Sequence, residues 1–274
     1  MRLLYKIFNF YLDASIHVAL AVFALVEVTA MTLNSSGSLK LSFFLFFGTI
    51  VAYNFVKYGV EAKKYILVAN VYQKYIQWIS FISFLGALYC AYFLPIQVWV
   101  GVLFLLLITG LYAIPVKAKA TNLRNLGGFK ILIVAVVWAG ATVLLPSLYV
   151  KTALNWDVLV EVIQRFVFVL VLLLPFEIRD IKYDAETLGT LPQKIGVLNT
   201  KIVGFLLLLV FLVLPYFKDD YSLVEVRVQH LIGIVLGIVL LRTSVNQHAY
   251  FASFFVEAIP ILWCVLLWCS FVVL

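Results

Sequence analysis

Residues 176–196 read FEIRDIKYDAETLGTLPQKIG and begin where the apolar run 158–176 ends. The three carboxylates near the start of this stretch are Glu177, Asp180 and Asp184. Their spacings of three and four residues place them on one face of a helix. Because like charges on one face repel, a cation between them would stabilise the arrangement, and a divalent metal is the first candidate. The alternative is a solvated helix end whose acids are neutralised by Arg179, Lys182 and water.

The amino-acid composition indicates the class of protein. The chain has 274 residues, of which 65% are hydrophobic and 12% charged, and its mean hydropathy is +1.11. These values lie far outside the usage of soluble globular proteins. The apolar runs are continuous, whereas the strands of an outer-membrane barrel would alternate apolar and polar residues. The sequence therefore predicts an all-α, polytopic membrane protein embedded in a lipid bilayer.

The apolar runs predict nine membrane-spanning helices, because about 20 apolar residues cross a bilayer as a helix. They are 14–33, 41–60, 76–94, 97–114, 128–147, 158–176, 200–217, 229–242 and 250–273. Three longer polar connections are predicted on the cytoplasmic side, at 61–75, 115–127 and 177–199. There is no low-complexity linker, so we expect one membrane domain over 1–274 that binds a lipid-soluble ligand.

The distribution of Lys and Arg predicts the orientation. With the N-terminus in the cytoplasm, most of the 20 basic residues fall on the cytoplasmic side, as basic residues do in membrane proteins. The four on the opposite side are Lys40, Lys151, Lys218 and Arg227, while Arg165 falls inside a span. Nine spans then place the C-terminus outside, in what we expect to be a bacterial cytoplasmic membrane. The formal charge of +7 follows from this topology and does not require a nucleic-acid partner.

A few charged residues lie within predicted spans, where each costs about 2.5–3.5 kcal/mol on insertion. Glu161 and Arg165 are four residues apart on one helix, so we predict an internal ion pair near the outer end of their span. Glu27 and Glu257 have no partner nearby in the sequence. For these two, a position facing a polar cavity is predicted.

The region of the three carboxylates resembles a known family. RDIKYDAETLGTLPQKIG is similar to the second aspartate-rich motif of the UbiA superfamily of intramembrane prenyltransferases. The matching residues are Asp180, Asp184, Gly189, Thr190, Leu191 and Gly196. The spacing from Asp184 to Thr190 is one residue shorter than the usual form.

A second segment, LYAIPVKAKATNLRNLGGFK, resembles the Tyr-x-x-Pro segment of the same family and the basic residues that follow it. The corresponding residues here are Tyr112, Pro115, Lys117, Arg124 and Lys130. The nine predicted spans and the predicted orientation also fit the family, so the resemblance extends over nearly the whole chain.

The resemblance implies a nine-helix bundle and transfer of an isoprenoid chain from a prenyl diphosphate to an aromatic or quinone-precursor acceptor, with Mg²⁺ as cofactor. The implied catalytic residues are Asp180, Asp184 and Asn54. The implied metal ligands are Asp180, Asp184, Glu177 and Glu61. The implied substrate-binding residues are Lys57, Tyr112, Lys117, Arg124, Lys130 and Arg179.

The first family motif is altered here. In the segment NFVKYGVEA, Asn54 aligns with the family's Asn, and Glu61 is the carboxylate that remains nearby. Phe55, Tyr58 and Ala62 stand where the family places acids. This departure keeps a second reading open, a catalytically inactive relative that binds polyprenyl lipids. A transporter is a further alternative, although a transporter would place paired, interrupted helices around a site at the membrane midplane.

Overall fold

The computed structural model describes residues 2–59, 70–113, 129–150, 155–185 and 188–273, and every regular element in these ranges is a helix. The α-helices are α1 (Arg2–Asp13), α2 (Ile16–Thr32), α3 (Leu39–Asn54), α4 (Val71–Ala91), α5 (Ile96–Ala113), α6 (Phe129–Ala139), α7 (Leu145–Tyr149), α8 (Trp156–Asp180), α9 (Leu191–Val213), α10 (Leu223–Arg242) and α11 (Ile259–Val273). Helical segments of other pitch extend or join them. These are the π-helical η1 (Phe55–Gly59), η3 (Gly140–Leu144) and η6 (Phe251–Val256), and the 3₁₀ segment η5 (Leu214–Phe217). The predicted all-α fold is confirmed.

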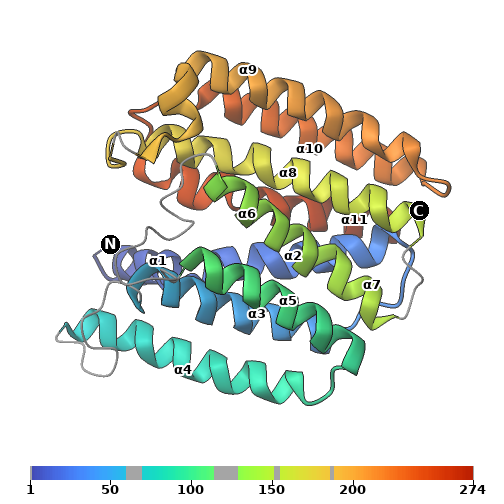
Figure 1. Cartoon of the computed structure of the whole chain (residues 1–274), viewed down its shortest axis with the longest axis horizontal. Helices are drawn as coiled ribbons and strands as arrows, with labels where there is room; N and C mark the ends of the chain where they lie inside the picture. Colours follow the sequence, from blue (N-terminus) through green and yellow to red (C-terminus); the bar gives the residue numbers. More distant parts are fainter. Residues whose placement is uncertain (1, 60–69, 114–128, 151–154, 186–187, 274) are drawn as a thin grey trace.

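The long helices run side by side along one axis, and α1 begins at the opposite end of the bundle from the end of α11 (Figure 1). We call the end that holds Asp13, Lys130, Glu177 and Asp180 the polar end, and the other the far end. The helix α8 lies centrally and packs against α6 and α9, while α2 packs against α3 and α11. Three large rings meet in the core: Phe168 lies 5.6 Å from Phe211 and 5.0 Å from Trp263, between ring centroids.

Six helical segments in the described ranges are long and apolar enough to cross a membrane. They are Leu39–Tyr58, Lys130–Tyr149, Trp156–Asp180, Leu191–Phe217, Leu223–Arg242 and Phe251–Val272. The bent pair α1 and α2 makes a seventh if it is counted as one span. The predicted spans 76–94 and 97–114 fall on α4, which carries several polar residues, and on α5, whose apolar described part is shorter. Each predicted span thus falls on a helix, but the count of nine crossings is not confirmed.

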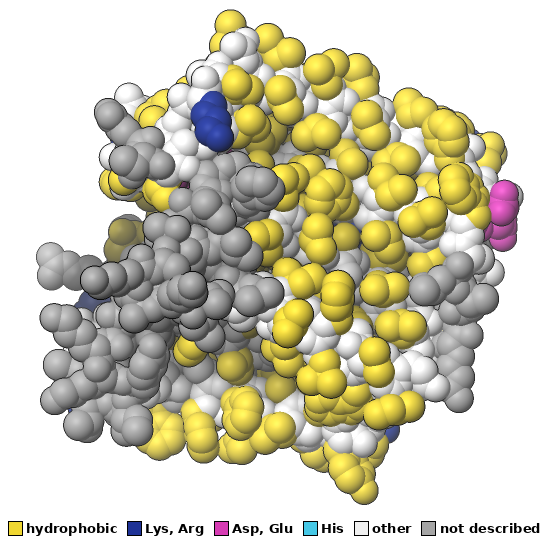
Figure 2. All heavy atoms as spheres, viewed as in Figure 1, with side chains coloured by type: hydrophobic (Ala, Val, Ile, Leu, Met, Phe, Trp, Pro, Cys, Tyr) yellow, Lys and Arg dark blue, Asp and Glu magenta, His cyan; other side chains and the backbone are white. Residues whose placement is uncertain are grey.

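The outer surface of the bundle suits lipid. Figure 2 shows a face covered by hydrophobic side chains, with few charged groups, which lie toward its margins. Large side chains such as Leu103, Leu107 and Leu209 are about 60% exposed (62%, 62% and 59%). Helices satisfy their own backbone hydrogen bonds, so such a surface is stable in hydrocarbon, whereas in water it would be an aggregation hazard.

The chain bends between α1 and α2. Ser15 has a φ of 60°, in the left-handed region, and the two helices diverge by 56°. Along α1, Lys6, Asn9 and Asp13 recur at helical spacing on one face. The exposed apolar residues of α1 are Leu3, Leu4, Tyr5 and Ile7. This pattern is typical of a helix that lies along a membrane–water interface.

Four buried charges join the helices at the far end. Arg165 Nη2 lies 3.0 Å from Glu161 Oε1, so the predicted ion pair is confirmed. Lys218 Nζ lies 2.6 Å from the second oxygen of Glu161 and also pairs with Glu225. Arg165 Nη1 donates a further hydrogen bond to the backbone oxygen of Leu25, at 2.9 Å. Two acids and two bases thus form an electrically balanced cluster that connects α2, α8 and α10.

Candidate functional site

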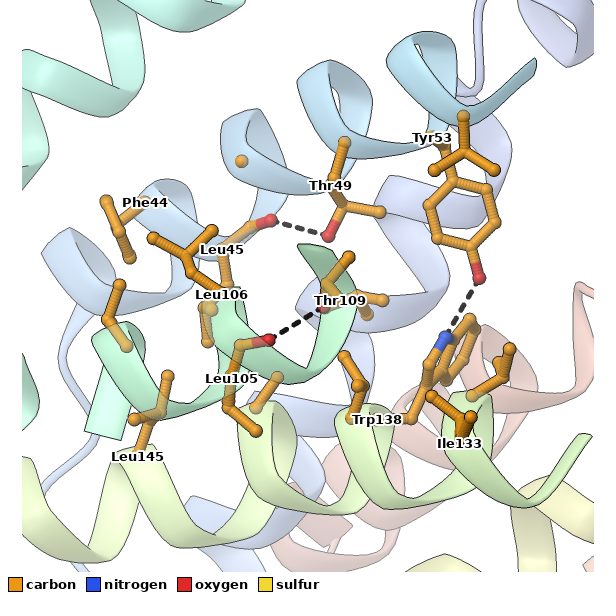
Figure 3. A pocket seen from close by; sticks show the side chains of 18 residues that line it. Phe44, Leu45, Thr49, Tyr53, Leu105, Leu106, Thr109, Ile133, Trp138 and Leu145 are labelled. Atoms are coloured by element: carbon orange, nitrogen blue, oxygen red, sulfur yellow. Dashed lines mark hydrogen bonds between the residues drawn. The ribbon is translucent and has the colours of Figure 1, made fainter. Parts of the chain in front are cut away.

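An apolar cavity of about 260 Å³ lies between α2, α3, α5 and α6. Figure 3 shows Phe44, Thr49 and Tyr53 on one wall, Leu105 and Thr109 on a second, and Ile133 and Trp138 on a third. Hydrocarbon side chains make up most of the lining. A cavity of this kind fits an apolar ligand, with the few polar groups of the wall fixing its orientation.

The polar side chains on the cavity wall are engaged by hydrogen bonds. The hydroxyl groups of Thr49 and Thr109 donate to backbone oxygens one turn earlier in their own helices, at 2.7 and 2.8 Å. Trp138 Nε1 donates to the hydroxyl oxygen of Tyr53 at 2.9 Å, which joins α6 to α3 across the cavity (Figure 3). The two threonines therefore add little polarity to a cavity otherwise suited to hydrocarbon.

The cavity wall formed by α6 leads to a charged group at the polar end. Ile133 and Trp138 line the cavity, and Lys130 lies about one turn before Ile133 on the same helix face. Lys130 Nζ lies 3.0 Å from Glu177 Oε1, in the last turns of α8. A cationic side chain and a buried acid therefore stand just beyond the polar end of an apolar cavity.

The other two of the three carboxylates, Asp180 and Asp184, lie in different surroundings. Arg179 Nε lies 2.8 Å from Asp180 Oδ1, so part of the alternative reading, an acid neutralised by its neighbouring arginine, is present. The helix α8 ends at Asp180, and Asp184 lies in the following turn instead of on the helix. The prediction that all three acids share one continuous helix was wrong in this respect. The Asp184 amide still donates to the Asp180 backbone oxygen at 2.8 Å, which continues the helical hydrogen-bond pattern by one step.

The chain then turns between Asp184 and the start of α9. Gly189 has a φ of +57°, which favours glycine, and Pro192 lies in the first turn of α9. Gln193 accepts a hydrogen bond from the Thr190 amide at 2.9 Å and donates to the Asp184 backbone oxygen at 3.3 Å. The start of α9 therefore holds the turn that carries Asp184.

Two carboxylate oxygens at the polar end are buried and have no hydrogen-bond partner in the part of the chain that the structure describes. They are Glu177 Oε2 and Asp184 Oδ2. Within the same ranges, no group of three or more His, Cys, Asp or Glu residues is arranged to hold a metal. Mg²⁺ is often bound by one or two carboxylates and completed by substrate phosphates and water. The donor set fits one ion held in that way; the described side chains do not form a complete cage.

Asn54 is held by protein contacts at the end of α3. Its side-chain oxygen accepts from Ser15 Oγ at 2.8 Å, and its nitrogen donates to the Ala14 backbone oxygen at 3.1 Å and to Ser80 Oγ at 2.9 Å. The amide thus joins the bend between α1 and α2 to α3 and α4. This geometry favours a positioning role for Asn54.

A second group of charges lies at the polar end near Asn54. Lys57, in η1, is attracted electrostatically by Glu257 and Asp13. Glu257, directly after η6, is also attracted by Arg179. The charged neighbours of Glu257 thus come from other elements, and the polar cavity expected beside it stays a prediction. Glu27, by contrast, accepts a hydrogen bond from Ser42 Oγ at 2.6 Å, so its partner comes from the next span.

Three residues implied by the resemblance, Glu61, Lys117 and Arg124, lie outside the described residues. Tyr112 belongs to α5, but its side chain is also outside the description. The cavity residues Thr49, Thr109 and Trp138 are absent from the predicted site. The sequence signal for the two threonines is a polar residue within an apolar helix, once in α3 and once in α5. Such a signal does not indicate which helices face each other.

Comparison with known proteins finds similarity in fold and none in sequence. No protein-family model matches the sequence, and no curated protein matches it. A solved structure of a UbiA homolog from Archaeoglobus fulgidus bound to DMAPP and Mg²⁺ is similar, with a TM-score of 0.58, 13% identity, and coverage of 96% of this chain and 99% of that chain. A structure of digeranylgeranylglyceryl phosphate synthase in membranes has a TM-score of 0.57 and 12% identity, and 98% of each chain is covered.

These similarities show the fold. The chain is an integral membrane protein with the helical architecture of the UbiA-type membrane proteins, so the helical fold that the resemblance implied is confirmed, apart from its count of nine spans.

Proposed function

We propose that this protein is an intramembrane prenyltransferase, which transfers an isoprenoid chain from a prenyl diphosphate to an aromatic or quinone-precursor acceptor. One observation carries the proposal: the α6 wall of an apolar cavity leads within one turn to Lys130, beside the acidic residues of α8. A prenyl diphosphate has the same division, an apolar chain attached to an anionic head. The UbiA fold supports the assignment, and so does the bound DMAPP of the Archaeoglobus fulgidus homolog.

In this proposal the prenyl chain lies in the cavity and the diphosphate lies at the polar end. Lys130 and Arg179 supply cationic donors to the phosphate oxygens, and charge-assisted hydrogen bonds of this kind are stronger than neutral ones. Lys57, Lys117, Arg124 and Tyr112 are the further candidates from the sequence. Following the distribution of Lys and Arg, the polar end faces the cytoplasm and so does the N-terminus.

The reaction breaks the bond between the allylic carbon and the diphosphate oxygen, and the electron pair leaves with the diphosphate. An acceptor carbon then bonds to the allylic carbon and gives up a proton to the released diphosphate. Lys130 and Arg179 stabilise the negative charge that grows on the leaving group. Tyr53 and Trp138 line the cavity, and in this scheme their rings stabilise positive charge on the prenyl chain.

The proposed cofactor is magnesium, with Asp180 and Asp184 as its ligands and Glu177 and Glu61 as the further candidates. When bound, the ion would act as a Lewis acid on the leaving group. Asn54 is a positioning residue in this scheme, because its side chain holds the end of α3 against α2 and α4.

The test is binding of a non-hydrolysable prenyl thiodiphosphate to protein in nanodiscs, with and without magnesium, followed by turnover of the reactive diphosphate with aromatic acceptors. The key variant is Asp180→Asn/Asp184→Asn. Its matched control is Asp219→Asn/Asp220→Asn, which removes two exposed acids at the far end. We expect magnesium-dependent binding in the wild type and in the control, and its loss in the key variant. Equal binding by all three proteins with and without the ion would contradict the metal assignment.

The altered first motif favours a second candidate, a non-catalytic protein that binds polyprenyl lipids. Phe55 and Tyr58 replace acids, and Asn54 makes its hydrogen bonds within the protein. The same preparation distinguishes the two: diphosphate release with an acceptor present supports the transferase, whereas tight binding with no release across an acceptor panel supports the binding protein.

A further inference from the structure

The cavity is small for a prenyl-binding site. A cavity of about 150 Å³ lined by aliphatic and aromatic side chains accommodates benzene, which has six carbon atoms. Scaled on that basis, the cavity of about 260 Å³ holds about ten carbon atoms. That is the size of two isoprene units.

Tight packing closes the cavity toward the far end. Leu145, from the start of α7, is part of the lining. A Cβ atom built on Gly101 would lie 2.5 Å from Leu145 Cδ2 and 3.1 Å from a methyl carbon of Leu148, so these leucines press directly against α5. Phe44 makes an edge contact with Trp99, at 6.3 Å between ring centroids, beside the same region. A chain that enters from the polar end therefore meets packed side chains at the other end.

Gly48 lies on the cavity wall and has no side chain to fill the space beside it. Glycine in a membrane helix often allows a neighbour to pack closely, as Gly86 does for Phe47 and Gly204 does for Leu174, with built Cβ distances of 2.9 and 2.7 Å. Gly48 differs, because a Cβ atom there would meet no described atom within 4 Å, and the residue lines the cavity. Its missing side chain adds room for a ligand.

From this geometry, and resting on the proposed function, we propose that the cavity binds at most two isoprene units of the donor chain, and that Gly48 is a residue that sets this limit. A third unit would have to displace Leu145 or Phe44, or leave the cavity between helices.

The experiment measures the affinity of a series of thiodiphosphates, from dimethylallyl through geranyl and farnesyl to geranylgeranyl, for the wild type in nanodiscs. We expect affinity to rise about tenfold or more from dimethylallyl to geranyl, because a further apolar unit becomes buried, and to change by less than about threefold beyond geranyl. Gly48→Leu should remove the advantage of geranyl and leave dimethylallyl binding unchanged.

Gly110→Leu is the matched control, because Gly110 also has open space around its Cβ position but does not line the cavity. It should keep the wild-type profile. Leu145→Ala should extend the rise in affinity to farnesyl, since it enlarges the closed end.

The outcomes separate the two proposals. An affinity that keeps rising through geranylgeranyl, or the same profile for Gly48→Leu and Gly110→Leu, would overturn the chain-length inference and leave the proposed function standing. Failure of every thiodiphosphate to bind the folded wild type would overturn both.

Discussion

Lys218 Nζ lies 2.6 Å from Glu161 Oε2, and both side chains are fully buried. Lys218 follows η5 and Glu161 lies near the start of α8, so their contact joins segments that are far apart in the chain. Glu225 and Arg165 complete the cluster and balance its charge. Removing one charge would leave an uncompensated opposite charge among buried side chains.

We therefore expect Lys218→Met to lower the free energy of unfolding by about 3–5 kcal/mol. Replacing Glu225 by Gln in the same protein should recover part of the loss, because the charges balance again. The measurement is unfolding in detergent micelles, with Lys74→Met, a change at an exposed lysine, as the control. A loss no larger than that of the control would show that the cluster contributes nothing to stability.

The stabilisation by Lys218 should also have a defined pH dependence. Burial lowers the pKa of Lys218, but the attraction of Glu161 and Glu225 outweighs it, so the pKa lies above the usual value. A raised pKa in the folded state means that the stabilisation is complete below the unfolded-state pKa of about 10.4 and is lost as the pH rises through the folded-state pKa. The difference in unfolding temperature between wild type and Lys218→Met should not fall between about pH 7 and 9.5. A difference that falls within this range would contradict the sign.

Asn54 gives a prediction that separates positioning from metal binding. Asn54→Asp keeps the acceptor for Ser15 but removes the two donations to Ala14 and Ser80, so we expect a loss of about 1–3 kcal/mol in unfolding free energy. Ser80→Ala should cost less, because it removes one of these contacts. If Asn54→Asp instead keeps full stability and tightens magnesium-dependent diphosphate binding, Asn54 lies at the metal and not at a structural joint.

Variants of Lys130 and Glu177 should change the affinity for a prenyl diphosphate analogue in different ways. Lys130→Met should weaken binding of a prenyl thiodiphosphate about tenfold or more, because a charge-assisted contact is lost, and Lys130→Arg should keep most of the affinity. Glu177→Gln should leave the affinity unchanged or raise it, since Lys130 is then released from its ion pair. The measurement is a binding isotherm in nanodiscs. Weaker, magnesium-insensitive binding by Glu177→Gln would place Glu177 among the metal ligands.

The parts of the structure that sequence patterns predict are local. Continuous apolar runs indicate helices in a membrane, and the spacing of Glu161 and Arg165 on one helix indicates their ion pair. The partners Lys218 and Glu225 could not be found in this way, because they reach the pair from a different part of the chain. The same limit applies to Glu27, whose partner Ser42 lies on the next span.

In the candidate site, too, sequence patterns predict the local features and not the contacts between helices. The motif around Asp180 and Asp184 was located by its sequence, although the end of α8 at Asp180 was not. Helical spacing also places Lys130 and Trp138 on one face of α6. That Trp138 meets Tyr53 across a cavity depends on how α3 and α6 pack, which spacing on either helix leaves open.

The bend at Ser15 affects how the protein fits its membrane. Because α1 turns away by 56°, the first crossing depends on the 17 residues of α2, which span about 26 Å. The hydrocarbon core is about 30 Å thick. A lipid-facing helix would transmit this mismatch to the bilayer by thinning it, but α2 is mostly buried among its neighbours. The shortfall is therefore contained within the protein and is not passed on to the surrounding lipid.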